Sequence, residues 1–298
     1  MKLADKTGNR IVMKTMQQTI AGSFPLSGFG VHGGKPVTLD ISPAPVNHGI
    51  VFIRHNSEGR RESIPALSAS LGSTTLNTSI GSADFGVSTI EHLMAAIAAL
   101  GIDNLTIAID GPEVPILGGG SAEFISAFRK AGLVKQDAPR QYLTILKPVH
   151  VEDGQNWAEF VPHNGTRYEV EIDFPVASIG RQSFSFDLDA DVFEREIAKA
   201  RTFGFMRDVE KLRSMGLALG SSLENSIAIG DEGEVLNPDG LHYADEFVRH
   251  KLLDSVGDLA LAGHPFRGLF RSYRGGHKLN ALLVKTLLEK PDHFQMES

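Results

Sequence analysis

The residues best suited to chemistry lie near the end of the chain, where His250, Asp254 and Asp258 recur every four residues in the stretch HKLLDSVGD. Each residue of an α-helix turns by about 100°, so residues at this spacing lie along one helix face. An imidazole and a carboxylate one turn apart, such as His250 and Asp254, can bind the same metal ion. The same pattern occurs in an ordinary amphipathic helix with a polar face, so a metal site needs a third ligand from elsewhere.

The segment 88–101 (STIEHLMAAIAALG) contains a candidate for this third ligand. Ser88, Glu91 and Gly101 have the spacing of a helix N-cap, the acidic partner of a capping box and a helix stop. The capping box gives Glu91 a structural role, whereas His92 has no such explanation. Because the residues after His92 are almost wholly apolar, we expect a buried helix that presents a metal ligand, His92, and a base, Glu91, at its polar end.

Together, His92, His250 and Asp254 form a set of two histidines and one carboxylate. The chain has no cysteine, which excludes thiolate ligands and cysteine nucleophiles. Such a set leaves one position for water and is typical of catalytic rather than structural zinc. Iron(II) uses the same donors, so the residues do not distinguish the two metals. Zinc lowers the pKa of a bound water toward ~7, and Glu91 is then the expected general base.

Three further residues fit the hydrolysis of a carbonyl compound. His277 follows a glycine pair and is a candidate general acid for a leaving amine, or a cation over the developing oxyanion. Asp258 is suited to hydrogen-bond His277 and raise its pKa. Lys251 is suited to stabilise a tetrahedral intermediate or to bind phosphate. Each of the three is also explained as an ordinary surface residue.

The composition restricts the classes of protein. With 298 residues the chain is long enough for two domains, and 42% hydrophobic with 22% charged residues is typical of a globular protein. A formal charge of -7 gives no electrostatic reason to expect nucleic acid. No apolar run approaches the roughly 20 residues that span a bilayer. We therefore expect a cytoplasmic protein, without stable membrane insertion and monomeric, and the absence of cysteine fits a reducing compartment.

The expected elements follow the same order in both halves of the chain. Strands are expected at 19–31, 36–42, 49–54, 104–110, 142–151, 157–161, 168–174, 183–187 and 266–273. Helices are expected at 88–101, 121–132, 191–200, 244–262 and 278–289, with a further helix and strand inserted between 201 and 235. The polar segment 135–141 separates the halves.

This order predicts an α+β fold of two similar domains. Each would be a β-sheet with a helix pair, and the two would pack helix layer to helix layer. The first domain, 17–134, would carry Glu91 and His92. The second, 141–298, would carry His250, Asp254 and His277, and an insertion of about 204–235. Helix-to-helix packing would bring His92 against the helix of His250.

Five separated motifs add a family resemblance. They are GFGVHGG (28–34), STIEHL (88–93), RTFGF (201–205), HKLLDSVGD (250–258) and GHKLN (276–280). In this order, from about residue 17 to about residue 288, the chain resembles the UDP-3-O-acyl-N-acetylglucosamine deacetylase family of Gram-negative bacteria. The resemblance implies a zinc-dependent amidohydrolase that removes acetate from the sugar nitrogen of a small UDP-acyl-sugar, at the committed step of lipid A synthesis.

The resemblance also implies roles for particular residues. Zinc would be held by His92, His250 and Asp254, with Glu91 as base, His277 as acid and Asp258 holding His277. Substrate or intermediate would be contacted by Lys251, Thr202 and Phe203. The insertion would correspond to the family's acyl-chain passage. Its leucines and methionine would either line that passage or pack the insertion onto the domain; they are Leu212, Met215, Leu217 and Leu219.

Other classes of protein compete with this interpretation. The stretch PILGGGSA (115–122) resembles a phosphate-binding loop of small-molecule kinases, because backbone amides at a helix N-terminus bind anions. A kinase would need a nucleoside triphosphate and magnesium, and would leave the histidines without a role. A binding module with satisfied core histidines would need neither metal nor turnover. A zinc amidase acting on another acetylated sugar or peptide fits the chemistry equally, and the family resemblance argues against it.

Overall fold

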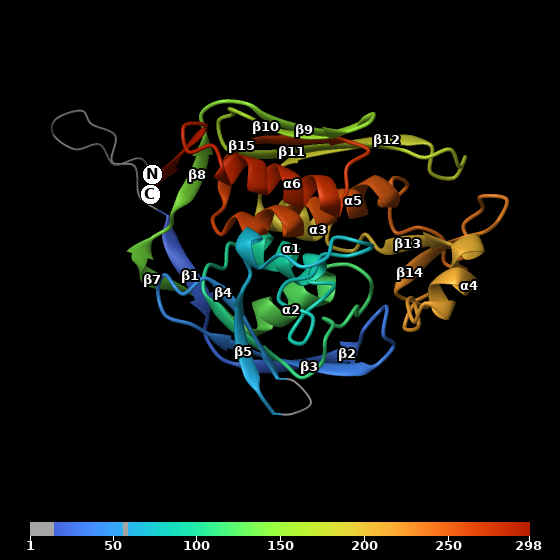
Figure 1. The fold of residues 1–298 in the computed structure, drawn as a ribbon, viewed down its shortest axis with the longest axis horizontal. Helices are drawn as coiled ribbons and strands as arrows, with labels where there is room; N and C mark the ends of the chain where they lie inside the picture. Colours follow the sequence, from blue (N-terminus) through green and yellow to red (C-terminus); the bar gives the residue numbers. More distant parts are fainter. Residues whose placement is uncertain (1–14, 56–58) are drawn as a thin grey trace.

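The computed structural model describes residues 15–55 and 59–298, which form four layers (Figure 1). A five-stranded sheet and a seven-stranded sheet form the two outer layers. Two layers of helices lie between them, so each sheet buries only its inner face. The expected α+β fold, with two helix layers packed against each other, is confirmed.

The first unit is the five-stranded sheet, in the order β2-β3-β6-β4-β5, with two helices. Its strands are β2 (Phe24–Phe29), β3 (Pro36–Pro43), β4 (Ile50–His55), β5 (Arg61–Pro65) and β6 (Leu105–Ile109). In β3, the side chains of Val37, Leu39 and Ile41 are buried and alternate with more exposed ones, as expected for a strand with one face on the core. The helices are α1 (Glu91–Leu100) and α2 (Ala122–Ala131).

The second unit is the seven-stranded sheet, in which β12-β11-β15-β10-β9 are joined by β8 and β16. Its strands are β8 (Tyr142–Ile145), β9 (Val149–Asp153), β10 (Asn156–Val161), β11 (Thr166–Asp173), β12 (Arg181–Asp187), β15 (Phe266–Tyr273) and β16 (Phe294–Glu297). Its helices are α3 (Ala190–Glu196), α5 (Glu246–Leu259) and α6 (His277–Leu288), and α5 and α6 pack on the inner face of the sheet.

The two units share one topology. Strands β2, β3, β4, β5 and β6 occupy the same positions in their sheet as β9, β10, β11, β12 and β15 do in theirs. Each sheet has one parallel pair among these strands, β4 with β6 and β11 with β15. In both units a helix, α1 or α5, precedes the last of these strands, and the two helices pack against each other. The repeated element order expected from the sequence is therefore confirmed, although the sequence shows no residue-level repeat.

The segment expected to separate the halves is mostly a strand. Strand β7 (Leu133–Pro139) pairs antiparallel with β1 (Met16–Ile20) in a two-stranded ribbon. Pro139 is the last residue of β7, where a missing N–H costs little. The stretch 19–31, expected to be strand broken by glycine turns, contains the end of β1, which begins at Met16, and the whole of β2. The domain boundary itself stays a prediction.

The insertion between α3 and α5 contains the expected helix and strand. Strand β13 (Thr202–Phe205) pairs in parallel with β14 (Ser226–Ile229), and α4 (Met206–Ser214) lies between them in the chain. The insertion projects from one end of the helix layers (Figure 1). Two single-turn 3₁₀ helices complete the described elements, η1 (Ser68–Ser70) and η2 (Ala260–Ala262).

Candidate active site

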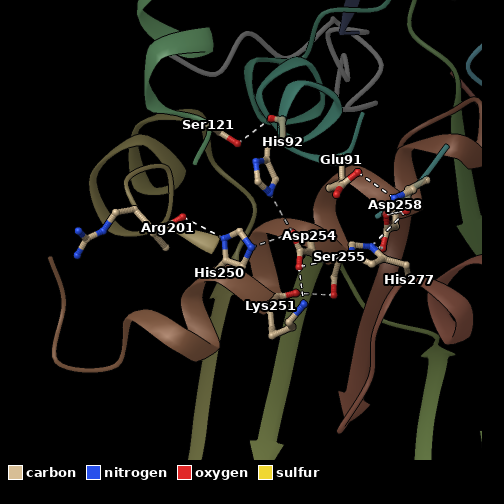
Figure 2. Close-up of polar contacts among 12 residues, drawn as sticks. Glu91, His92, Ser121, Arg201, His250, Lys251, Asp254, Ser255, Asp258 and His277 are labelled. Carbon is tan, nitrogen blue, oxygen red and sulfur yellow. Dashed lines mark hydrogen bonds and ion pairs between the residues drawn. The ribbon is translucent and has the colours of Figure 1, made fainter. Parts of the chain in front are cut away.

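Helices α1 and α5 of the two units approach each other closely at Gly257. A Cβ atom on Gly257 would lie 2.0 Å from the carbonyl oxygen of Glu91, so only glycine permits this contact. Glycine inside a helix costs about 1 kcal/mol relative to alanine, and here the contact between the helices offsets that cost. The contact brings Glu91 and His92 of α1 beside Asp254 and Asp258 of α5 (Figure 2).

The three predicted metal ligands converge in this contact. The candidate ligand atoms of His92, His250 and Asp254 all lie within 4.8 Å of one another, and the three side chains are buried. Nε2 of His92 and Nε2 of His250 lie 3.5 and 3.4 Å from Oδ1 of Asp254. No hydrogen-bond donor among the described residues reaches this buried oxygen. An unpaired buried carboxylate oxygen is unfavourable, and two imidazole nitrogens facing it fit a bound cation.

The surroundings of His250 prepare it to be a neutral ligand. Burial lowers the pKa of His250 to about 3, so its imidazole is uncharged at neutral pH. Its Nδ1 lies 3.1 Å from the carbonyl oxygen of Ala200. A neutral ring that donates from Nδ1 keeps the lone pair of Nε2 free for a metal. His92 is held differently, through its backbone oxygen, which accepts a hydrogen bond from the Ser121 hydroxyl at 2.8 Å.

The capping box predicted for Glu91 is wrong. Helix α1 begins at Glu91 itself, and Thr89 has a φ of 56°, so the chain turns just before the helix. The hydroxyl of Ser88 donates to Pro112 instead of capping the helix. The carboxylate of Glu91 accepts a hydrogen bond from the backbone N–H of Thr78 at 3.0 Å. Burial raises the pKa of Glu91, which brings a general base closer to neutral pH.

His277 and Asp258 form the predicted pair. Nδ1 of His277 lies 2.9 Å from Oδ2 of Asp258, and the amide of Asn280 donates to the same oxygen at 2.8 Å. Burial alone would lower the pKa of His277, but the charge of Asp258 and this hydrogen bond raise it to about 9. His277 is therefore protonated at neutral pH. Its Nε2 lies 4.0 Å from Oδ2 of Asp254, so the proton is next to the metal-ligand set.

Thr78 is a site residue whose role the sequence did not indicate. It lies in the irregular segment after β5. The Thr78 hydroxyl donates to Oδ1 of Asp258 at 2.6 Å, and its backbone N–H holds Glu91. Thr78 thus contacts both the candidate base and the partner of the candidate acid. The signal was weak, because the residue is one of many serines and threonines between 63 and 80.

Lys251, Thr202 and Phe203 lie beside the metal-ligand set. Nζ of Lys251 donates to Oδ2 of Asp254 at 2.7 Å. Burial would lower the pKa of Lys251, but the charge of Asp254 leaves it raised, so the ammonium is charged. The ring of Phe203 lies 6.2 Å from that of His250 and 5.8 Å from Nζ of Lys251. Thr202 precedes Phe203 in β13, and all three line the same cavity as the ligands.

This cavity has a volume of about 570 Å³ and extends from the candidate ligands into the insertion. Its wall within the insertion is largely apolar and includes Phe205, Val209, Leu212, Leu223, Ile227 and Leu236. Of the four candidate lining residues, Leu212 is in this wall, whereas Met215, Leu217 and Leu219 lie outside it. Leu219 instead packs against Gly34, so it fastens the insertion to the first unit.

The glycine run before α2 does not form a phosphate-binding loop. The backbone N–H of Ser121 donates to Ala198, and Gly119 accepts from Thr202, so this loop packs against the second unit. A Cβ on Gly119 would lie 1.8 Å from the carbonyl oxygen of Asn225. Protein backbone therefore occupies the space that a phosphate would need, and the kinase alternative loses its structural basis.

Within residues 15–55 and 59–298, none of the helices has the length and apolar character required to cross a membrane.

The buried His–His–Asp set, with a carboxylate on one side and a protonated imidazole on the other, is the arrangement of a metal-dependent hydrolase. Residues 17–289 match the family model described as LpxC, UDP-3-O-acyl N-acetylglycosamine deacetylase, and the chain belongs to this family. It is 53% identical over 286 residues to proteins named UDP-3-O-acyl-N-acetylglucosamine deacetylase from Brucella ovis, Brucella canis and Brucella abortus. These alignments cover 95% of this chain and 99% of each relative. The resemblance carried by the five motifs is confirmed.

Proposed function

We propose that this chain hydrolyses the acetamide of UDP-3-O-acyl-N-acetylglucosamine, giving the free amine and acetate at the committed step of lipid A synthesis. Family membership supports the substrate. One structural observation carries the chemistry: the unpaired, buried Oδ1 of Asp254 faces two imidazole nitrogens, between a candidate base and a candidate acid.

We further propose that His92, His250 and Asp254 hold one zinc ion. Iron(II) has the same ligand preference, and the donor set alone does not choose between them. When bound, such a cation acts as a Lewis acid, lowering the pKa of a water ligand toward ~7 and polarising a carbonyl. The neutral imidazole of His250 and the absence of thiolates support a catalytic rather than a structural site.

The side chains around the ligands would carry the proton transfers. Glu91 takes a proton from the water that adds to the acetamide carbon, and its raised pKa suits this role. The ammonium of Lys251 offsets the negative charge that develops on the carbonyl oxygen. His277 donates its proton to the sugar nitrogen as the C–N bond breaks, so that a neutral amine leaves and acetate remains. Asp258 keeps His277 protonated for this step.

The cavity supports the substrate class. Thr202 and Phe203 lie at the end of the cavity next to the ligands, where the sugar would bind. The largely apolar wall in the insertion suits an acyl chain, because burying each CH₂ contributes about 0.8 kcal/mol. Leu212 lies in that wall.

The remaining proposals concern organisation. We propose two domains, 17–134 and 141–298, with an insertion at about 204–235, on the basis of the repeated topology. One chain supplies all the candidate ligands, the base and the acid, which supports a monomeric enzyme. The cysteine-free composition supports a cytoplasmic location.

The test is elemental analysis of purified protein together with an assay of acetate release from UDP-3-O-acyl-N-acetylglucosamine. Wild type should contain about one zinc or iron per chain, and His250→Ala should lose the metal and the activity together. His150→Ala, which removes a half-exposed histidine on the outer sheet, is the matched control and should keep both. Full metal occupancy in His250→Ala would place the metal elsewhere. Wild type without metal or turnover would refute the proposed function.

A further inference from the structure

The two histidines of the ligand set belong to different units, yet one short segment, 198–202, is hydrogen-bonded to His250 and to Ser121, and Ser121 in turn holds the backbone of His92. The carbonyl oxygen of Ala200 accepts from Nδ1 of His250 at 3.1 Å. The carbonyl oxygen of Ala198 accepts from the backbone N–H of Ser121 at 2.8 Å. The hydroxyl of Ser121 in turn donates to the backbone oxygen of His92 at 2.8 Å. Three hydrogen bonds, together with the backbone of residues 198–200 and Ser121 itself, therefore link the ring of His250 to the backbone of His92.

A buried ion pair fixes segment 198–202 to helix α5. The backbone N–H and the Nε of Arg201 both donate to Oε1 of Glu246, at 2.9 and 3.0 Å. The two side chains are only 4% and 0% exposed. Glu246 lies one helical turn before His250, so its carboxylate ties the residue after Ala200 to the helix that carries the ligand. A buried ion pair adds little net stability, because desolvation offsets the attraction, so a positioning role is the better explanation.

On its other side, the segment is in tight contact with the loop before α2. A Cβ on Gly120 would lie 2.5 Å from the carbonyl oxygen of Ala198 and 2.9 Å from that of Ala200. The φ of Gly120 is not in the left-handed region, so alanine there would meet only this steric obstacle. On this side, segment 198–202 has no room for an added methyl group.

We propose that segment 198–202 is a strut that sets the distance between His92 and His250, with Glu246, Arg201 and Ser121 as positioning residues. The proposal rests on the proposed function, since it takes the His–His–Asp set as the metal site. It predicts that metal affinity depends on residues that contact neither the metal nor the substrate. Loss of a hydrogen-bonding partner behind a metal ligand typically weakens metal binding by ~10–100-fold.

The experiment measures the zinc dissociation constant of the full-length protein by competition with a chelator, and the melting temperature of each metal-free variant. Gly120→Ala pushes on two carbonyl oxygens, and Glu246→Gln removes the charge that holds Arg201. Both should weaken zinc binding by ~10–100-fold, and Ser121→Ala by less, because it removes one neutral hydrogen bond. Gly22→Ala is the matched control, since a Cβ on Gly22 meets nothing within 4 Å, and it should bind zinc as wild type does.

A double-mutant cycle separates the strut from general destabilisation. If Ser121→Ala and Glu246→Gln act through the same segment, their combined effect on zinc affinity should be smaller than the sum of the single effects. If Gly120→Ala and Ser121→Ala both bind zinc with wild-type affinity, the proposed role of segment 198–202 is refuted. This conclusion holds whether or not the melting temperature of these two variants falls. It also holds if Glu246→Gln does not fold. A wild-type protein that binds no zinc would instead overturn the proposed function, and the strut with it.

Discussion

Replacing Asp258 with asparagine should change the pH dependence of the enzyme more than its maximum rate. The asparagine keeps the shape of the side chain and can still accept the hydrogen bond from Thr78. It removes the negative charge that, with its hydrogen bond, raises the pKa of His277 to about 9. His277 must be protonated to donate a proton, so activity falls as the pH rises through this pKa, and Asp258→Asn should move that fall to lower pH.

The size of the shift follows from the contact. A hydrogen bond to a charged group contributes ~1.5–3 kcal/mol, and one pKa unit corresponds to ~1.4 kcal/mol, so the pKa of His277 should fall by ~1–2 units. At the pH that equals the wild-type pKa of His277 in the metal-bound enzyme, roughly 1–10% of His277 in the variant would be protonated instead of about half, a loss of ~5–50-fold in kcat/KM. At about three pH units below that pKa, the loss from this cause should be less than ~2-fold.

The assay is kcat/KM for acetate release between pH 5.5 and 10 for both proteins. In each pH profile, the alkaline limb is the range in which kcat/KM falls as the pH rises. The measured quantity is the shift of this limb between wild type and Asp258→Asn, because a bound cation lowers the pKa of His277 in both proteins. Asp153→Asn is the matched control: Asp153 pairs at the surface with Lys278, the neighbour of His277, and the alkaline limb should not move. A uniform loss at every pH, with the limb of Asp258→Asn unmoved, would refute the assigned role of Asp258.

Three further substitutions test other parts of the site. Glu91→Gln can keep the hydrogen bond from Thr78 but cannot accept a proton, so kcat should fall by ~10²–10⁴-fold at unchanged metal content, and near-normal turnover would exclude Glu91 as the base. Gly257→Ala raises the helix propensity of α5 by about 1 kcal/mol, but it places a Cβ 2.0 Å from the carbonyl oxygen of Glu91. Calorimetry should therefore show a lower melting temperature. A higher melting temperature would contradict the claim that α1 and α5 need glycine at this contact. Leu212→Trp narrows the apolar end of the cavity and should raise KM for long acyl chains more than for short ones; equal effects would place the acyl chain elsewhere.

The sequence correctly predicted the features that depend on residues close together in the chain. The His250-to-Asp258 spacing describes one helix face, and the apolar run after His92 describes one buried helix, so both helices were found with their functional residues. The repeated order of strands and helices also predicted that these helices would pack against each other. That inference needed only the rule that amphipathic elements bury their apolar faces together.

The sequence failed where a residue acts through a distant partner. Thr78 and Asp258 are 180 residues apart, and no local pattern marks one polar residue in a serine- and threonine-rich segment as the one that meets α5. The prediction of a capping box was wrong for the same reason. The spacing of a capping box is present, but the carboxylate of Glu91 accepts a hydrogen bond from the backbone N–H of Thr78 instead. Local propensity is a weak guide where a buried polar group has a competing partner.

The division of the site between two units makes its geometry depend on how the units pack. The two equivalent helices of the repeat do not contribute equally: α1 supplies His92 and the proposed base, Glu91, whereas α5 supplies His250, Asp254 and Asp258. A ligand set on one helix would survive small shifts between the sheets, but this one would not. A displacement of α1 along α5 would change the distance of His92 from His250 and Asp254. The close contact at Gly257 is therefore as necessary to the proposed metal site as the proposed ligands themselves.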